Sequence, residues 1–126
     1  MHTKIEIMTT QQIADRLVEL CRKGDFETAQ KELYDESIVS IEPVETENFE
    51  KETRGLPAIL SKGKKFYNMV ETVYAITVSD PIVASHAIAF VLSMDLKMKE
   101  KDRINMAELC VYETRDGKVI SEHFFM

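Results

Sequence analysis

The chain has 126 residues, 44% of them hydrophobic, and its 16 basic and 22 acidic residues give a net charge of −6. This length fits one compact domain, and the apolar content is sufficient for a core without disulfide or metal cross-links. The negative charge disfavours binding to nucleic acid or to an anionic membrane surface. We therefore expect a single domain over residues 1–126 that binds neither.

The cysteines and the N-terminal segment indicate the cellular compartment in which the protein is expected. Cys21 and Cys110 have neither CxxC spacing nor a dense cysteine framework around them, which favours reduced thiols in the core. No apolar run is long enough to span a membrane, and residues 1–7 lack the apolar segment of a secretory signal. These features predict a cytoplasmic protein.

Two amphipathic helices are predicted near the N-terminus. Thr9 and Gln12 have the spacing of a capping box, and the apolar residues that follow recur at helical intervals. Gly24 is expected to end this helix, and Asp25 to cap a second one. The apolar positions that define the two helices are Ile13, Leu17, Leu20 and Cys21, then Phe26, Ala29, Leu33 and Tyr34.

A short strand, an acidic loop and a third helix come next. Residues 37–43 are rich in β-branched side chains and end at a proline, which predicts a strand. Residues 45–54 carry six charges and read as a solvated, mobile loop or lid. Pro57 suits the first turn of a helix that continues through the apolar residues up to Val70.

The remainder of the chain predicts four consecutive strands, at residues 72–79, 82–98, 104–114 and 118–125. The links between them are short, and Asp116-Gly117 suits a tight hairpin. The predicted element order is ααβαββββ. It describes an α+β domain, a cone-shaped roll in which three helices pack against a curved antiparallel sheet that can enclose a pocket.

Several short matches, in this order, resemble one known family. They are the Gly24-Asp25 helix break, the run Leu33-Tyr34-Asp35 leading into the strand that ends Glu42-Pro43, the Gly55-x-x-Ala58-Ile59 start of the third helix, and the hairpin Asp116-Gly117-Lys118-Val119-Ile120. Together they resemble the SnoaL-like branch of the nuclear transport factor 2-like superfamily over nearly the whole chain.

The resemblance implies a fold more than an activity. The superfamily includes ketosteroid isomerases, polyketide cyclases, scytalone dehydratases and limonene epoxide hydrolases, beside proteins that only bind ligands or partners. It implies an open cone with ionisable residues deep inside that act on small apolar compounds, and a homodimer formed through the sheet face. No cofactor is implied.

Glu42 is the first candidate catalytic residue. It precedes Pro43 where the ketosteroid isomerases carry an aspartate-proline pair, so the resemblance implies a general base. Burial in an apolar cone would raise the pKa of such a carboxyl toward the working pH, so that it could accept a proton from a carbon beside a carbonyl. The alternative is a strand-end glutamate that faces solvent or pairs with a lysine.

Glu108 and Glu122 are further candidates. Glu108 interrupts an apolar strand and shares a face with Cys110 and Tyr112, so it could serve as an acid or share a proton with Glu42. The alternative is a cross-strand ion pair on the outer face. Glu122 falls at a position that lines the pocket in relatives, whereas its neighbour His123 would point to the opposite face.

His86 is the remaining catalytic candidate, because it lies early in the predicted strand 82–98, in phase with the apolar cavity face, and an imidazole side chain can bind or shuttle protons. The alternative is a hydrogen-bonded core or rim histidine. The histidine spacing predicts no metal site. The expected apolar lining, which ordinary core packing would explain equally well, is Phe66, Tyr67, Phe90, Leu92, Met94, Cys110, Tyr112 and Phe124.

Two functions remain open from the sequence. One is an acid–base isomerase, cyclase or dehydratase that acts on a small apolar carbonyl compound, with Glu42 as base and Glu108 or His86 as acid. The other is a non-catalytic ligand-binding or homodimeric assembly module. Leu17 favours the second, because it stands where the ketosteroid isomerases place an oxyanion-binding tyrosine.

Overall fold

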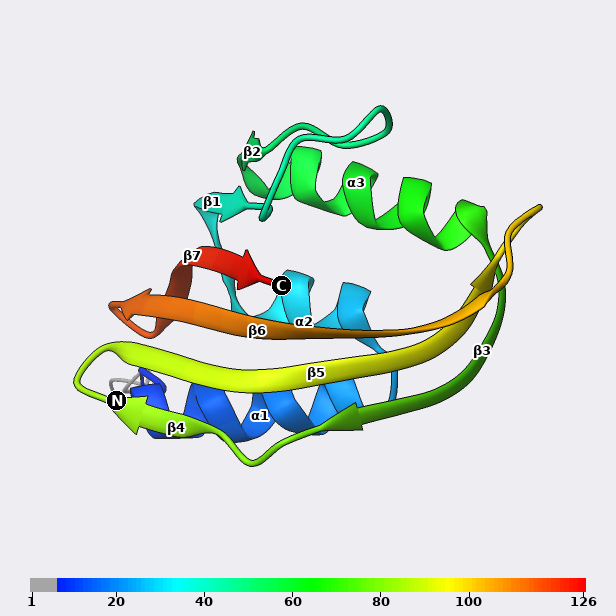
Figure 1. The fold of residues 1–126 in the computed structure, drawn as a ribbon. Helices are drawn as coiled ribbons and strands as arrows, with labels where there is room; N and C mark the ends of the chain where they lie inside the picture. Colours follow the sequence, from blue (N-terminus) through cyan, green and yellow to red (C-terminus); the bar gives the residue numbers. More distant parts are fainter. Residues whose placement is uncertain (1–6) are drawn as a thin grey trace.

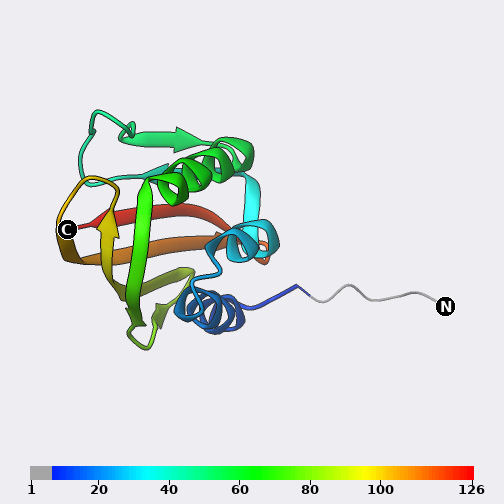
Figure 2. The same cartoon turned by 90° about the vertical axis from the view of Figure 1, so that its right-hand side faces the viewer.

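A computed structural model describes residues 7–126 as three helices on one side of a curved, seven-stranded sheet (Figures 1 and 2). Most of the N-terminal stretch that we expected not to be a secretory signal, residues 1–6, lies outside the described residues. Among the described helices, none combines the length and the apolar composition needed to cross a membrane.

The first two helices form largely as their local sequence predicts. In α1 (Thr10–Arg22), the Thr9 hydroxyl accepts a hydrogen bond from the Gln12 backbone and the Gln12 side chain accepts one from the Thr9 backbone, so the capping box is confirmed. Gly24 then takes a φ of 72°, a left-handed conformation that glycine adopts readily because it has no Cβ. Asp25 precedes α2 (Phe26–Leu33) but makes no side-chain capping bond, contrary to expectation.

The third helix and its flanking strands follow the predicted order with one addition. Strand β1 (Tyr34–Ile41) begins directly after α2, earlier than predicted, and α3 (Leu56–Met69) has Pro57 in its first turn. The acidic segment contains a short strand, β2 (Glu52–Arg54), that pairs antiparallel with the end of β1. Part of the predicted loop is therefore a sheet edge.

The C-terminal half forms β3 (Val70–Val78), β4 (Ile82–Ala84), β5 (Ala87–Met98), β6 (Arg103–Arg115) and β7 (Lys118–Phe125). The sheet order is β2-β1-β7-β6-β5-β3, and β4 pairs with β5. The α+β class and the antiparallel meander are confirmed. The sequence did not predict the two short strands or the parallel pairing of β1 with β7, which makes the sheet mixed.

The helices cover the concave face of the sheet unevenly. Helix α1 packs against β3, β4 and β5, whereas α3 packs mainly against β1 and β2 (Figure 1). The core between them includes a stack of Phe90 and Tyr112, with ring centroids 5.3 Å apart. Inward-facing polar side chains of β1, β6 and β7 consequently lie on the α3 side of this core.

Candidate functional site

Three glutamates from different elements face the concave side of the sheet, and we call them the carboxylate cluster. Glu42 follows the last residue of β1, Glu108 lies on β6, and Glu122 lies on β7. They are close enough for their charges to interact, because both Glu42 and Glu122 raise the pKa of Glu108. The structure thus brings together the three carboxylates that the sequence singled out.

Glu122 is the most deeply buried member of the cluster, with 3% of its surface exposed. The Tyr34 hydroxyl donates a hydrogen bond to its Oε2 atom. Burial raises the pKa of Glu122, and hydrogen bonds from Tyr34 and Ser40 offset part of that rise. Because both partners come from β1, the parallel pairing of β1 with β7 creates this network.

Glu42 forms an ion pair with Lys62 of α3, and both side chains are mostly buried, 22% and 19% exposed respectively. The Lys62 ammonium also donates to the Ser40 hydroxyl at 3.3 Å. Glu42 therefore matches the alternative of a glutamate paired with a lysine, although the pair lies inside the cluster and not in solvent. One carboxylate oxygen of Glu42 is therefore already paired with the Lys62 ammonium.

Glu108 differs from the other two carboxylates because no basic side chain lies within ion-pair distance of it among residues 7–126. Its one side-chain partner there is the thiol of Cys110, which donates to Oε1 over 3.8 Å. Burial, followed by the charges of Glu42 and Glu122, raises the pKa of Glu108 to about 7. A carboxyl of this kind can both accept and release a proton near neutral pH.

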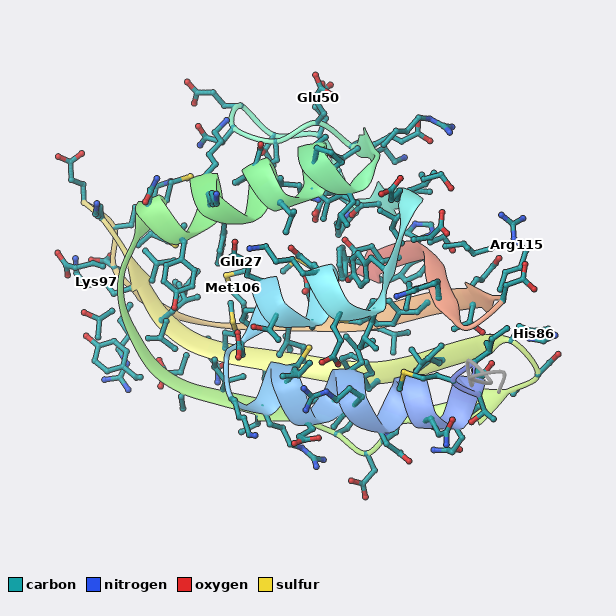
Figure 3. All side chains as sticks on the ribbon, turned by 180° about the vertical axis from the view of Figure 1, so that it is seen from behind. Glu27, Glu50, His86, Lys97, Met106 and Arg115 are labelled. Carbon is teal, nitrogen blue, oxygen red and sulfur yellow. The ribbon has the colours of Figure 1, made fainter. Side chains whose placement is uncertain are left out.

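A small cavity adjoins Glu108. It is lined by Leu92, Met94 and Met106 together with the carboxyl, and its volume is about 20 Å3. That is room for about one water molecule. Both methionines are only half-buried and have flexible thioether chains, so a rotamer change would widen the cavity. Met106 projects from β6 toward the helix side of the sheet (Figure 3).

The other expected lining residues divide between core and site. Phe90, Cys110 and Tyr112 are fully buried in the core, as their alternative reading predicted. The Phe124 ring packs edge-on against Tyr112, with centroids 6.5 Å apart, and the Lys62 ammonium lies 5.9 Å from its centroid. Phe66 is half-buried on α3.

Two expected site residues lie elsewhere. Tyr67 is 70% exposed on α3 and does not line the cluster. His86 is exposed in the turn between β4 and β5, because Ser85 takes a φ of 54° and folds the predicted strand 82–98 back on itself. Figure 3 shows His86 at the far end of the sheet from Met106, which lies two residues before Glu108 on β6, so His86 does not lie beside that carboxyl.

His123 lies on the face of the exposed Phe125, opposite the buried Glu122, as the strand alternation predicted. Its ring stacks on Phe125 with centroids 4.2 Å apart. Within residues 7–126, no group of three or more His, Cys, Asp and Glu side chains is arranged to hold a metal ion.

Lys62 and a larger opening beside it were not predicted from the sequence. A cleft of about 560 Å3 lies between residues 45–50 and α3, and Lys62 and Lys65 form part of its wall. Lys62 had a signal in the sequence, because it is three residues after Ile59 and four before Phe66, within the apolar stripe of α3. A lysine at such a position must find a partner, here Glu42.

Comparison with solved structures identifies the fold. A proposed SnoaL-like polyketide cyclase from Mesorhizobium loti is 26% identical, with a TM-score of 0.86 over 94% of this chain and 100% of that one. A proposed isomerase from Bacillus subtilis is 21% identical, with a TM-score of 0.69 over 93% and 88% of the two chains. A proposed SnoaL-like polyketide cyclase from Jannaschia sp. CCS1 is 11% identical, with a TM-score of 0.74 over 98% and 90%.

Sequence comparison gives the family. A search of curated proteins gave no match. The SnoaL-like domain family matches residues 8–126, which is nearly the whole chain. The resemblance inferred from the short motifs is thereby confirmed, and the chain belongs to the SnoaL-like domain family.

Proposed function

We propose that this chain is an acid–base enzyme of the isomerase, cyclase or dehydratase type, acting on a small apolar carbonyl compound with Glu108 as the group that moves the proton. One observation carries the proposal: Glu108 is a largely buried carboxyl with a pKa of about 7, beside a cavity whose other walls are apolar. An acid or base is most effective when its pKa lies near the working pH.

The sequence assigned the role of base to Glu42, and the structure favours Glu108. An oxygen of Glu42 pairs with Lys62, whereas the one side-chain donor to Glu108 within residues 7–126 is a weak one, the Cys110 thiol. Glu42 and Glu122 support Glu108 in this proposal, because their negative charges help to raise its pKa. The three glutamates then have different tasks, set by their partners.

The cavity at Glu108 limits which compounds can react. At about 20 Å3 it admits no substrate until side chains move. Met94 and Met106 are the side chains that would swing aside, since an unbranched thioether changes rotamer at low cost. We expect a small, apolar carbonyl compound that can place the carbon next to its carbonyl group against the Glu108 carboxylate.

The test is hydrogen–deuterium exchange at the carbon next to the carbonyl. A panel of small apolar ketones is incubated with the protein in D2O, and deuterium uptake is followed by NMR. We expect at least one ketone to exchange faster with the wild-type protein than in buffer, and Glu108→Gln to slow that exchange by about 10²–10⁴-fold. Glu113→Gln is the matched control, because Glu113 is exposed on the same strand. Equal exchange by wild type and Glu108→Gln would reject the proposal.

A homodimeric assembly role is the second candidate, and the convex face of the sheet favours it. Val91, Leu109 and Phe125 lie side by side in register on β5, β6 and β7, and are 42%, 41% and 46% exposed. Ile82 on β4 extends the exposed apolar surface beside them. Contiguous apolar patches of this kind are typical of protein contacts, and we propose a second copy of the chain as the occupant.

Sedimentation velocity tests the dimer. We expect a dimer at micromolar concentration and a monomer for Leu109→Lys, which places a charge at the centre of the row. Val73→Lys, at an exposed residue of β3 outside the row, should remain dimeric. A monomeric wild type would exclude this interface, and a dimer without any ketone exchange would favour the assembly role over the enzyme.

A further inference from the structure

We propose that the Lys62 ammonium binds the negatively charged oxygen of the compound in the carboxylate cluster, so that the site selects compounds that carry or develop an oxyanion. This inference rests on the proposed function for its chemistry and extends it to a residue and a substrate class. Lys62 is suited to this role by its contacts and its burial.

Lys62 is the cation of the site. Its side chain is 19% exposed, whereas its neighbours Lys64 and Lys65 on α3 are exposed. Removing an ammonium from water costs free energy that is recovered only through close partners. The partners of Lys62 are the Glu42 carboxylate, the Ser40 hydroxyl at 3.3 Å and the face of the Phe124 ring at 5.9 Å. Its charge also lowers the pKa of both Glu108 and Glu122.

The ammonium retains capacity for a ligand. It has three N–H donors, and the acceptors within hydrogen-bond distance among residues 7–126 are Glu42 and Ser40. The nearby Phe124 ring belongs to the concave face, where it packs against Tyr112. The third donor is available to a ligand oxygen that enters through the cleft of about 560 Å3 whose wall includes Lys62.

Other candidate donors are committed or absent. The Tyr34 hydroxyl already donates to Glu122, and the Tyr112 ring is fully buried in the core. Leu17 of α1 offers no polar group. No other basic residue makes an ion pair with a member of the carboxylate cluster among the described residues.

The chemistry requires such a donor. When the Glu108 carboxylate removes a proton from the carbon beside a carbonyl, the C–H electron pair forms a C=C bond and the C=O π pair moves to oxygen. The resulting enolate oxygen bears the charge and gains most from a donor that is already in place. Return of the proton from Glu108 to carbon restores the carbonyl, so that neither an oxidant nor a second reactant is needed.

A phenol tests the oxyanion site separately from proton transfer. 4-Nitrophenol is titrated into the protein, and the visible absorbance of its ionised form reports the ionisation of the bound molecule. With wild type we expect binding of the phenolate and a bound phenol pKa below its value in buffer. Lys62→Met should weaken phenolate binding at least tenfold and abolish this shift, Lys62→Arg should retain part of both, and Lys64→Met should behave as wild type.

The outcomes separate the two proposals. Unchanged phenolate binding by Lys62→Met, or no phenolate binding by wild type, overturns the role of Lys62. If Lys62→Met does not fold, the NMR signal of the methylene beside the Lys62 nitrogen in the wild-type chain decides, because it must shift when phenolate is added. Lysine-dependent phenolate binding without ketone exchange would reject the enzyme and retain the anion site. Ketone exchange that depends on Glu108, without lysine-dependent phenolate binding, would retain the enzyme and reject the anion site.

Discussion

The Tyr34 hydroxyl at the start of β1 donates a hydrogen bond to the Glu122 carboxylate on β7, 88 residues later in the chain. Both groups are buried. Burial and the Glu122 charge raise the pKa of Tyr34 well above its ordinary value, and the hydrogen bond from Tyr34 lowers the pKa of Glu122. The pair fixes Glu122 at the base of the carboxylate cluster.

Tyr34→Phe should therefore destabilise the protein. It leaves a buried carboxyl without its phenol donor, which costs about 1–3 kcal/mol in free energy of unfolding. Urea denaturation measures the change. Glu122→Gln keeps an acceptor for the hydroxyl and should cost less than Tyr34→Phe. If the double variant shows the full sum of the two single losses, the two side chains do not interact as the structure indicates.

The pH dependence of stability should report Glu108. Its pKa is about 7 in the folded chain against an ordinary value of 4.5, so between these values the folded protein holds a proton that the unfolded chain has released. The free energy of unfolding should then fall as pH rises from 4.5 to 7, by at most about 3 kcal/mol from this group. Urea titrations at several pH values should show a shallower fall for Glu108→Gln than for wild type. Glu113→Gln should retain the wild-type slope.

Met106→Ala should open the cavity at Glu108. The truncation removes a half-buried wall of a cavity that now holds about 20 Å3, and we expect a stability cost below about 2 kcal/mol because burial is incomplete. Binding of 4-nitrophenol, followed by absorbance, should tighten severalfold, since no methionine must move. Met126→Ala, at a residue that is 73% exposed, should leave binding unchanged. Weaker binding by Met106→Ala would show that the thioether contacts the ligand and does not block it.

The helix caps offer a prediction independent of the site. Thr9→Ala breaks a capping box with both hydrogen bonds present and should cost about 1 kcal/mol. Asp25→Ala removes a residue at the same position of α2 that makes no side-chain capping bond, so its cost should be smaller. Thermal denaturation of the two variants gives the comparison, and an equal loss in both would contradict it.

The features that the sequence predicted well depend on neighbours in the chain. The α1 capping box, the turn at Gly24 and the hairpin at Asp116-Gly117 each arise within a few residues, and both hairpin residues take the positive φ that such a turn requires. Alternation along β6 and β7 likewise put Glu108 on the face of Cys110 and Tyr112, and Glu122 on the face opposite His123. It did not decide whether the Glu108 face is the concave one, so the convergence of the glutamates was not predicted.

The features that were missed depend on tertiary contacts. The apolar run 82–98 gave no sign of the turn at Ser85, so His86 was placed in a strand that does not contain it. Tyr67 fits the helical stripe of α3 by spacing but lies on its solvent side. The pairing of β1 with β7 joins distant segments, and no local pattern specifies which strand a given edge will accept.

That parallel pairing has a consequence for the order in which the chain folds. The β3, β5, β6 and β7 meander is built from near neighbours in sequence, whereas β1 must close a loop of roughly eighty residues to reach β7. Long-range pairing loses more chain entropy before it gains contacts, so it is expected late. Tyr34 and Ser40 both lie on β1, so an intermediate that contains only the meander would hold Glu122 without these two hydrogen-bond partners. The chemistry proposed here would then be acquired in the last folding step, together with the final strand.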